Sequence, residues 1–366
     1  MTSGFQEIKD MAPPASTTGP IGWLRQNLLS SPVNILLTIF SVYLILKFVP
    51  PILDWAIFSA DFIGKDQKAC TSGGACWVFI SARLDLFIYG FYPLDQYWRV
   101  DWMFALLAIT FVPQFFDAFP YKKAFGMFAL FVLPVIAYIL LLGGSFGLTP
   151  VDTNQWGGLM LTLVLAYVGI VAALPIGILL ALGRQSKMPV IRTICICFIE
   201  LWRGVPLISV LFMASVMLPL FLPEGMNFNK LLRALIGIVM FQSAYMAEVV
   251  RGGLQAIPKG QSEAASALGL SYWKSMRLIV LPQALKLVIP GIVNTFIALF
   301  KDTTLVLIIG LLDILASVQS AIVDPAWRDV STEGYVFAAF SFWIFCFSIS
   351  RYSQALERKL HTGHKR

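Results

Sequence analysis

The feature that most constrains this chain is a series of long apolar runs. A helix of about 20 residues crosses the hydrocarbon layer of a bilayer, which is about 30 Å thick. Eight runs are long and apolar enough for this, at 33–52, 101–119, 124–143, 157–182, 198–222, 231–250, 283–300 and 334–352. Hydrophobic residues make up 58% of the 366 positions, more than a soluble domain of this length can bury. We therefore predict an all-α, polytopic membrane protein with about eight transmembrane helices.

The segment 303–320 is a ninth candidate span, but it is shorter and carries Asp313. Basic residues decide between the two topologies, because loops rich in Lys and Arg stay in the cytoplasm. With eight spans and a cytoplasmic N-terminus, seventeen basic residues fall on the cytoplasmic side and eight on the outside. A ninth span would put the basic tail 353–366 outside. We therefore predict that 303–320 is a helix that enters the protein without crossing it.

Composition and missing motifs exclude several function classes. The net charge of +7 is spread along the chain without a cluster interleaved with aromatic residues, so we expect no nucleic-acid partner. The only histidines, His361 and His364, lie in the basic tail, so we predict no metal site and no catalytic Ser/His/Asp or Cys/His set. The phosphate-binding loop G-x-x-x-x-G-K-[ST] does not occur, and we expect any ATP to be bound by a partner.

The cysteines divide by predicted compartment. Cys70 and Cys76 flank the sequence TSGGA in the predicted outside loop 53–100, where oxidation is allowed. Two glycines let the chain turn tightly there, so a disulfide and a pair of free thiols both stay open. Cys195, Cys197 and Cys346 are expected to be small apolar fillers.

The stretch EAASALGL, residues 263–270, lies in the predicted cytoplasmic loop 251–282 and favours helix formation. Pro258 permits a helix start, and Gly269 stands where a left-handed C-terminal cap is needed. Ser271 can then cap a second short helix that ends near Pro282.

The composition of this first helix suits a protein contact. Ala264, Ala265 and Ala267 keep its surface low enough for a close approach, and Glu263 offers a charge to a basic partner. From these residues alone, an amphipathic connector lying on lipid headgroups is an equally good interpretation.

Four stretches resemble the permease subunits of bacterial ABC importers for polar amino acids. Glu263, Ala264, Ala265 and Gly269, with Ile279, Leu281 and Pro282, are similar to the EAA loop of that family. ELWRGVPL at 200–207 resembles the family's RGTPL stretch, with Val205 in place of Thr. KDTTLVLIIG at 301–310 and SAYMAEVVRGGLQAIPKGQ at 243–261 resemble two further family segments. Three predicted spans precede the region 155–352 that holds these four stretches, at 33–52, 101–119 and 124–143. Together with the loop 53–100 they look most like the M-type permease of the general L-amino-acid uptake system.

The resemblance implies a type I importer permease core in the bacterial inner membrane. It implies a second permease, two ATP-binding subunits and a periplasmic amino-acid-binding protein as partners. Glu263, Ala264, Ala265 and Gly269 would form the coupling helix, which docks in a groove of an ATP-binding subunit. The chain would be a transport subunit and not an enzyme, and it would hold no cofactor.

The same resemblance sets the predicted regions. They are a cytoplasmic tail at 1–31, an accessory membrane region at 32–154 with the periplasmic loop 53–100, a permease core at 155–352 with the coupling loop 251–282, and a basic cytoplasmic tail at 353–366.

Polar residues near the predicted helix break suggest a substrate path. Asp302 lies between the seventh span and 303–320, and broken helices supply substrate sites in transporters. Asn294, about two turns earlier, and the adjacent Thr303 complete the predicted path. Two simpler roles stay open, namely Asp302 as a cap of the following helix and Asn294 in a helix–helix hydrogen bond. Elsewhere, Glu200, Arg203, Glu248 and Arg251 are expected to extend towards the cytoplasmic interface.

Two other functions were weighed against the ATP-driven importer. An ion-coupled secondary amino-acid transporter should show two similar halves and buried acidic sites, and we find no convincing internal repeat. A purely structural membrane subunit is disfavoured by the amino-acid-permease stretches.

Overall fold

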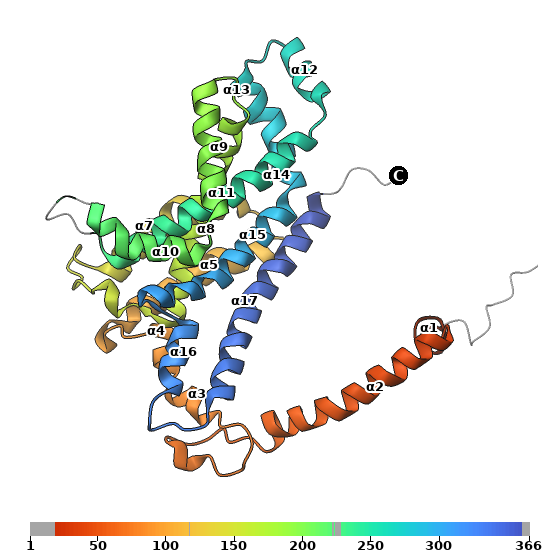
Figure 1. Ribbon diagram of the computed structural model, residues 1–366, viewed down its shortest axis with the longest axis vertical. Helices are drawn as coiled ribbons and strands as arrows, with labels where there is room; N and C mark the ends of the chain where they lie inside the picture. The colour runs from red at the N-terminus through yellow and green to blue at the C-terminus, as the bar shows by residue number, and fades with distance from the viewer. Residues whose placement is uncertain (1–18, 117, 222, 224–227, 361–366) are drawn as a thin grey trace, which may run out of the picture. The chain divides into compact units, whose positions relative to one another are not determined.

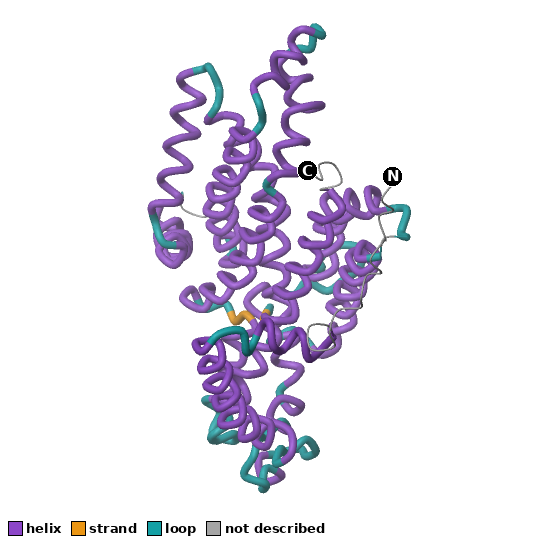
Figure 2. The backbone as a smooth tube through the Cα atoms, turned by 90° about the vertical axis from the view of Figure 1, so that its right-hand side faces the viewer, coloured by secondary structure: helices purple, strands orange, loops and turns teal. Residues whose placement is uncertain are grey.

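The structure is a computed structural model that describes residues 19–116, 118–221, 223 and 228–360. The first part of the predicted tail 1–31 lies outside these residues, as do His361 and His364 in the basic tail. Most of the described backbone is helical (Figure 2), and β1 Leu312–Asp313 is a strand of two residues. The prediction of an all-α, polytopic fold is therefore confirmed.

The chain forms two compact units that divide after Val78. The first unit contains α1 Gly19–Asn27, α2 Pro32–Leu53, the π-helical turn η1 Asp54–Phe58 and the 3-10 turn η2 Gln67–Ala69. The hydroxyl of Ser31 accepts a hydrogen bond from the Asn34 N–H at 3.2 Å and so begins α2. Together α2 and η1 give an apolar helix of 27 residues, close to the predicted span 33–52.

The second unit holds the remaining elements (Figure 1). The first of these are α3 Val78–Ala82, which begins at the boundary, α4 Leu84–Tyr89, η3 Leu94–Gln96, α5 Tyr97–Phe111, η4 Val112–Phe115, α6 Lys122–Met127, η5 Phe128–Val132, α7 Leu133–Leu142 and η6 Thr153–Gln155. The elements from there to α11 are α8 Gly158–Arg184, α9 Pro189–Gly204, α10 Leu207–Phe212, η7 Met213–Met217, η8 Leu218–Phe221 and α11 Lys230–Ala256. After it come α12 Lys259–Ala267, α13 Tyr272–Ser275, η9 Met276–Val280, α14 Leu281–Leu287, α15 Ile289–Asp302, η10 Thr303–Ile309, β1 Leu312–Asp313, α16 Ile314–Ile322 and α17 Ser331–Leu360.

Six helices in the described part of the chain are long and apolar enough to span a membrane, and a bent pair makes a seventh. The bent pair joins Pro189–Gly204 to Leu207–Phe221 at 103°. The bend falls on RGVPL, because Pro206 has no N–H to donate and forces Val205 into an extended conformation. The predicted span 198–222 is therefore not one straight helix.

The predicted span 101–119 is the one of the eight predicted spans that is missing from these seven candidates. Its residues form α5 and then the 3-10 turn η4, which contains Pro113. The α-helical part is about 22 Å long, and the four residues of η4 that continue it add about 8 Å, so the two together still approach the thickness of the hydrocarbon layer. The predicted span thus exists as an α-helix that tightens into a 3-10 turn at Pro113.

The prediction of one helix over 303–320 is wrong. The 3-10 run η10 continues the span that starts at Ile289, and the chain reverses at Gly310, whose φ is +71°. Only glycine adopts this left-handed conformation without strain. A new helix, α16, then starts where the Asp313 carboxylate accepts a hydrogen bond from the Ala316 N–H at 2.9 Å.

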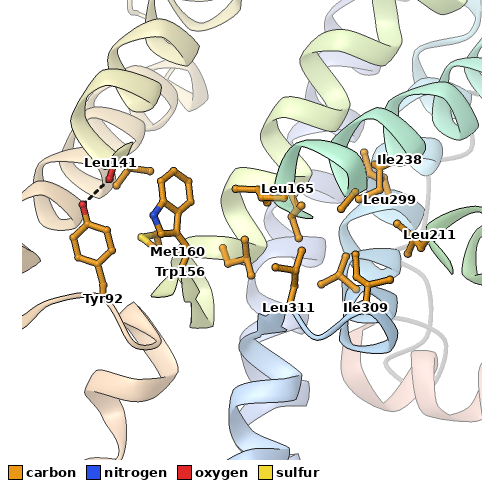
Figure 3. Close-up of a cluster of buried hydrophobic side chains, with 14 of the residues drawn as sticks. Tyr92, Leu141, Trp156, Met160, Leu165, Leu211, Ile238, Leu299, Ile309 and Leu311 are labelled. Carbon is orange, nitrogen blue, oxygen red and sulfur yellow. Dashed lines mark hydrogen bonds between the residues drawn. The ribbon is translucent and has the colours of Figure 1, made fainter. Parts of the chain in front are cut away.

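The core of the second unit lies around α8 and α11, which pack along each other. Figure 3 shows Leu165 of α8 close to Leu311 and Ile309, which are brought in by η10 and its reversal, while Met160 of the same helix lies beside Trp156. Ile238 of α11 and Leu299 of α15 continue this cluster, and Tyr92 is tied to it by a hydrogen bond from its hydroxyl to the Leu141 carbonyl at 2.8 Å.

Candidate functional site

The loop after α11 contains a helix with a complete C-terminal cap. Gly269 has a φ of +72°, as the sequence predicts for a left-handed cap. Its N–H donates to the Ser266 carbonyl at 2.9 Å, and the Leu270 N–H donates to the Ala265 carbonyl at 3.1 Å. These two bonds form a Schellman motif, which satisfies carbonyls that the helix end would otherwise leave unpaired. The cap fixes the length and direction of α12.

The faces of α12 differ in exposure. Glu263 and Ala264 are exposed, and the Glu263 side chain has no hydrogen bond or ion pair within the described chain. Ala265 is buried, because α12 packs on η9 through this residue. The expected low surface is therefore made by Ala264 and Ala267, whereas Ala265 holds the helix down on its own subunit.

The second part of the loop differs from the prediction. Ser271 precedes α13, but its hydroxyl makes no cap hydrogen bond. The helical path does not end near Pro282 either, since it runs from α13 through the π-helical turn η9 into α14. Pro282 lies at the start of α14 inside this continuous helical path, where its missing N–H removes one backbone hydrogen bond.

One hydrogen bond holds α12 to α14, and a close approach of α11 to α14 anchors the base of the loop. The Gln283 amide of α14 donates to the Gln261 side-chain oxygen at 3.2 Å and to the Ile279 carbonyl at 3.0 Å. At the base of the loop, a Cβ on Gly253 would lie 2.7 Å from the Ala284 carbonyl oxygen. Only glycine allows α11 and α14 to approach this closely. The loop is therefore anchored on both sides of α12.

An ion network joins the ends of α8, α9 and α11 near this loop. The Glu248 carboxylate of α11 contacts Arg184 of α8 at 2.8 Å and Arg251 at 2.7 Å, and Arg203 of α9 at 3.7 Å. Arg184 also contacts Glu200 of α9 at 3.0 Å. The expectation that the side chains of Glu200, Arg203, Glu248 and Arg251 extend towards the cytoplasmic interface stays a prediction, and the structure adds that they pair across three helices. Their spacing along the chain gave no sign of this, since Arg184 and Glu248 are far apart in sequence.

The three predicted path residues do not share one face of α15. Thr303 is buried, and its hydroxyl donates to the Phe300 carbonyl at 2.8 Å. Asn294 is exposed on the opposite side, nine positions earlier. Asp302 is half-buried between them, and its side chain makes no cap hydrogen bond to η10. The simpler role of Asp302 as a helix cap therefore fails, and Asp313 performs that role for α16.

One exposed stripe of α15 carries a charge that sequence analysis left out. Asn294, Ala298 and Lys301 follow one another at intervals of four and three residues, and all three are exposed. In the described part of the chain, the Lys301 ammonium has no acidic partner within ion-pair distance. Lys301 and Asp302 thus place opposite charges side by side in a helix that is long and apolar enough to cross a membrane.

The outer loop of the first unit is closed by side-chain contacts. Cys70 and Cys76 form a disulfide. The Asp61 carboxylate accepts hydrogen bonds from the Thr71 N–H at 2.9 Å, the Ser72 N–H at 3.1 Å and the Ser72 hydroxyl at 2.8 Å. The bonds from Ser72, and then that from Thr71, hold the pKa of Asp61 below its ordinary value.

Comparison with known proteins identifies the segment that contains α12 and α15. The family described as "Binding-protein-dependent transport system inner membrane component" matches residues 173–362. The chain is 57% identical over 341 residues to the "Inner membrane amino-acid ABC transporter permease protein YhdY" of Escherichia coli K12, covering 93% of each chain. It is 39% identical to the "Glutamate/glutamine/aspartate/asparagine transport system permease protein BztC" of Rhodobacter capsulatus, covering 99% of each.

A solved structure is similar over a smaller part. It is described as "Crystal structure of an amino acid ABC transporter with histidines" and is 29% identical, with a TM-score of 0.49. The match covers 55% of this chain and 92% of that one.

Proposed function

Because this chain belongs to the family of binding-protein-dependent transport system inner membrane components, we propose that α12 couples it to ATP hydrolysis on a separate subunit. The chain is an amino-acid ABC transporter permease, a multi-pass protein of the inner membrane and not an enzyme. Membership of this family removes the reason to consider an ion-coupled secondary transporter. It also implies partnership with other components of an ABC transporter.

The observation that carries the coupling role is the geometry of α12. Its cap fixes a short helix, its Glu263 side is exposed, and its Ala265 side is anchored to η9. A helix of this kind suits a groove on another protein, since the small Ala264 and Ala267 let the partner come close. We take Glu263, Ala264 and Gly269 as the residues that meet or shape this contact, with Ala265 as their support.

The proposed assembly has a second permease beside this one, two ATP-binding subunits below them and a periplasmic amino-acid-binding protein above. The ATP-binding subunits would hold the nucleotide, and this chain would need no cofactor of its own. The four regions proposed from sequence stay as 1–31, 32–154, 155–352 and 353–366. The family match at 173–362 supports placing the permease core in the C-terminal part.

The proposed substrate path runs along the exposed stripe of α15. An amino acid is a zwitterion, and each of its charges needs a partner once it leaves water. Asp302 can accept the ammonium group, Lys301 can contact the carboxylate, and Asn294 can hydrogen-bond to either. Thr303 is buried, and its hydroxyl bonds to the Phe300 carbonyl, so it can contribute to the path only as the neighbour that follows Asp302 in the chain. The relative from Rhodobacter capsulatus is named for glutamate, glutamine, aspartate and asparagine, which favours polar amino acids as the cargo.

Two substitutions in α12 test the coupling role. We expect Glu263→Arg to reverse the exposed charge and Gly269→Pro to destroy the cap, and each to abolish uptake at normal membrane levels. ATP hydrolysis by the assembled complex should then no longer rise with loaded binding protein.

Matched variants separate coupling from general damage. Gly269→Asn keeps a residue that tolerates the left-handed conformation and should retain most uptake. Asp66→Arg makes the same charge change on an exposed acid of the outer loop and should leave hydrolysis coupled to uptake. Normal uptake by both Glu263→Arg and Gly269→Pro would end the assignment.

A further inference from the structure

A cavity of about 720 Å³ lies between the coupling loop and the ends of α8, α9 and α11. Figure 1 shows α9, α12 and α13 gathered at this end of the second unit. The cavity is lined by four basic side chains, those of Arg184, Arg192, Arg251 and Lys259. The residues that line it include no acidic residue. Gln255 and Ser262 add neutral hydrogen-bonding groups. A cavity of this size accommodates a small ligand.

The four basic residues differ in whether they form ion pairs with acidic side chains. Arg184 and Arg251 contact Glu248, which fixes their positions and offsets part of their charge. Arg192 and Lys259 are exposed, and neither has an acidic partner in the described part of the chain. The cavity therefore combines two positioned guanidinium groups with two cations that nothing in the subunit neutralises.

We propose that this cavity binds a phosphate-bearing anion, which links α9 to the coupling loop. Phosphate oxygens suit the site, because guanidinium groups donate parallel hydrogen bonds to them and an ammonium group adds a point charge. Arg192 of α9 and Lys259 of α12 both line the cavity, so an anion bound there has cations from both elements around it. Its binding would hold α12 against the helix ends and so set how freely the coupling loop moves.

Two sources supply this chemistry, the headgroup of an anionic phospholipid and free phosphate from the cytoplasm. The position favours the lipid, since the cavity lies where α8 and α11 end, at the predicted cytoplasmic surface. The adjacent face of α9 exposes Val190, Ile191 and Ile194, which acyl chains can cover.

The test uses the protein extracted from membranes with its co-purifying subunits. Native mass spectrometry would record binding of dioleoyl phosphatidylglycerol, with dioleoyl phosphatidylcholine as the lipid of no net charge. Calorimetric titration would record binding of inorganic phosphate. We expect the double variant Arg192→Gln/Lys259→Gln to weaken phosphatidylglycerol binding by about 30-fold, at about fivefold for each basic residue. It leaves the contacts of Glu248 intact.

The control variant is Arg277→Gln/Lys286→Gln, which removes one exposed Arg and one exposed Lys of the same region outside the cavity. It should bind like the wild type. A selective loss for phosphatidylglycerol supports the lipid as the source, and a selective loss for inorganic phosphate supports the free ion. The proposal is overturned if the Arg192→Gln/Lys259→Gln variant binds phosphatidylglycerol as tightly as the wild type does and also binds inorganic phosphate as tightly.

Discussion

At the scale of single residues, two buried or half-buried carboxylates have opposite roles. Asp313 is fully buried, and one of its oxygens caps α16 while the other has no hydrogen-bond partner in the described part of the chain. Asp302 is only half-buried and caps nothing. The first therefore fits a structural role and the second an interaction with something outside the chain.

Asp313 makes stability depend on pH. Burial raises its pKa to about 6 from 3.8, so between these values the unfolded chain has lost the proton that the folded chain keeps. The stability contribution is fully present below pH 3.8 and is lost as the pH rises through about 6. We expect Asp313→Asn, which still caps the helix, to raise the free energy of unfolding at pH 7.5 by up to about 3 kcal/mol.

Thermal unfolding of the purified protein between pH 4 and 8 checks this. The gain should shrink towards pH 4, and Asp66→Asn, at an exposed position, should show no gain at any pH. A gain of equal size at both ends of the range would contradict the assignment.

Asp302→Asn tests the substrate path. The change removes the charge but keeps the size, so we expect uptake per assembled complex to fall at least tenfold, as one lost ionic contact implies. Docking of the binding protein should persist. Asn294→Ala is expected to have a smaller effect, because an uncharged amide gives a zwitterion a hydrogen bond but no ion pair. Wild-type uptake by Asp302→Asn would remove this residue from the path.

At the scale of helices and loops, periodicity and caps predict what is local. The apolar runs found the long helices, and the cap at Gly269 was predictable from one glycine after an alanine-rich helix. The bend before Pro206 and the reversal at Gly310 were not, because proline and glycine also occur inside unbroken membrane helices, as Pro175 does in α8. Likewise, the path residues of α15 could be named but not assigned to faces.

The ion network shows the limit most clearly. Glu248 and its partners come from three helices, and only the packing of α8 on α11 brings Arg184 to it. A charged side chain near the end of a span is expected to contact water. Nothing in the sequence indicates that these charged side chains pair with one another instead.

This network predicts an asymmetry between its two acids. Glu248 is mostly buried and contacts three arginines, whereas Glu200 is exposed and contacts one. Removing the charge of Glu248 leaves several partly buried cations unpaired, so we expect Glu248→Gln to lower the free energy of unfolding by about 3 kcal/mol. Glu200→Gln should cost less than about 1 kcal/mol. Chemical denaturation of both variants in one detergent measures the difference, and equal losses would contradict the central place of Glu248.

At the scale of the whole molecule, the predicted topology assigns each exposed turn to one side of the membrane. Single cysteines at Ile63, Leu268 and Val323, in a chain without its own cysteines, give three strongly exposed reporters. We expect an impermeant thiol reagent to label Ile63→Cys and Val323→Cys in intact cells, and Leu268→Cys only after permeabilisation. Labelling of Val323→Cys from the cytoplasmic side would mean that 303–320 crosses the membrane.

The close approach of Gly253 to Ala284 has a mechanical consequence. If an ATP-binding subunit pushes on α12, the hydrogen bond between Gln283 and Gln261 would transmit the movement to α14, which would pivot about its close contact with Gly253. Between α14 and Asp302 the helical path is interrupted only at Val288, which separates α14 from α15. On the proposed coupling, a push on α12 would therefore reach α15 through Val288, and the stiffness of this joint would determine how far Asp302 moves.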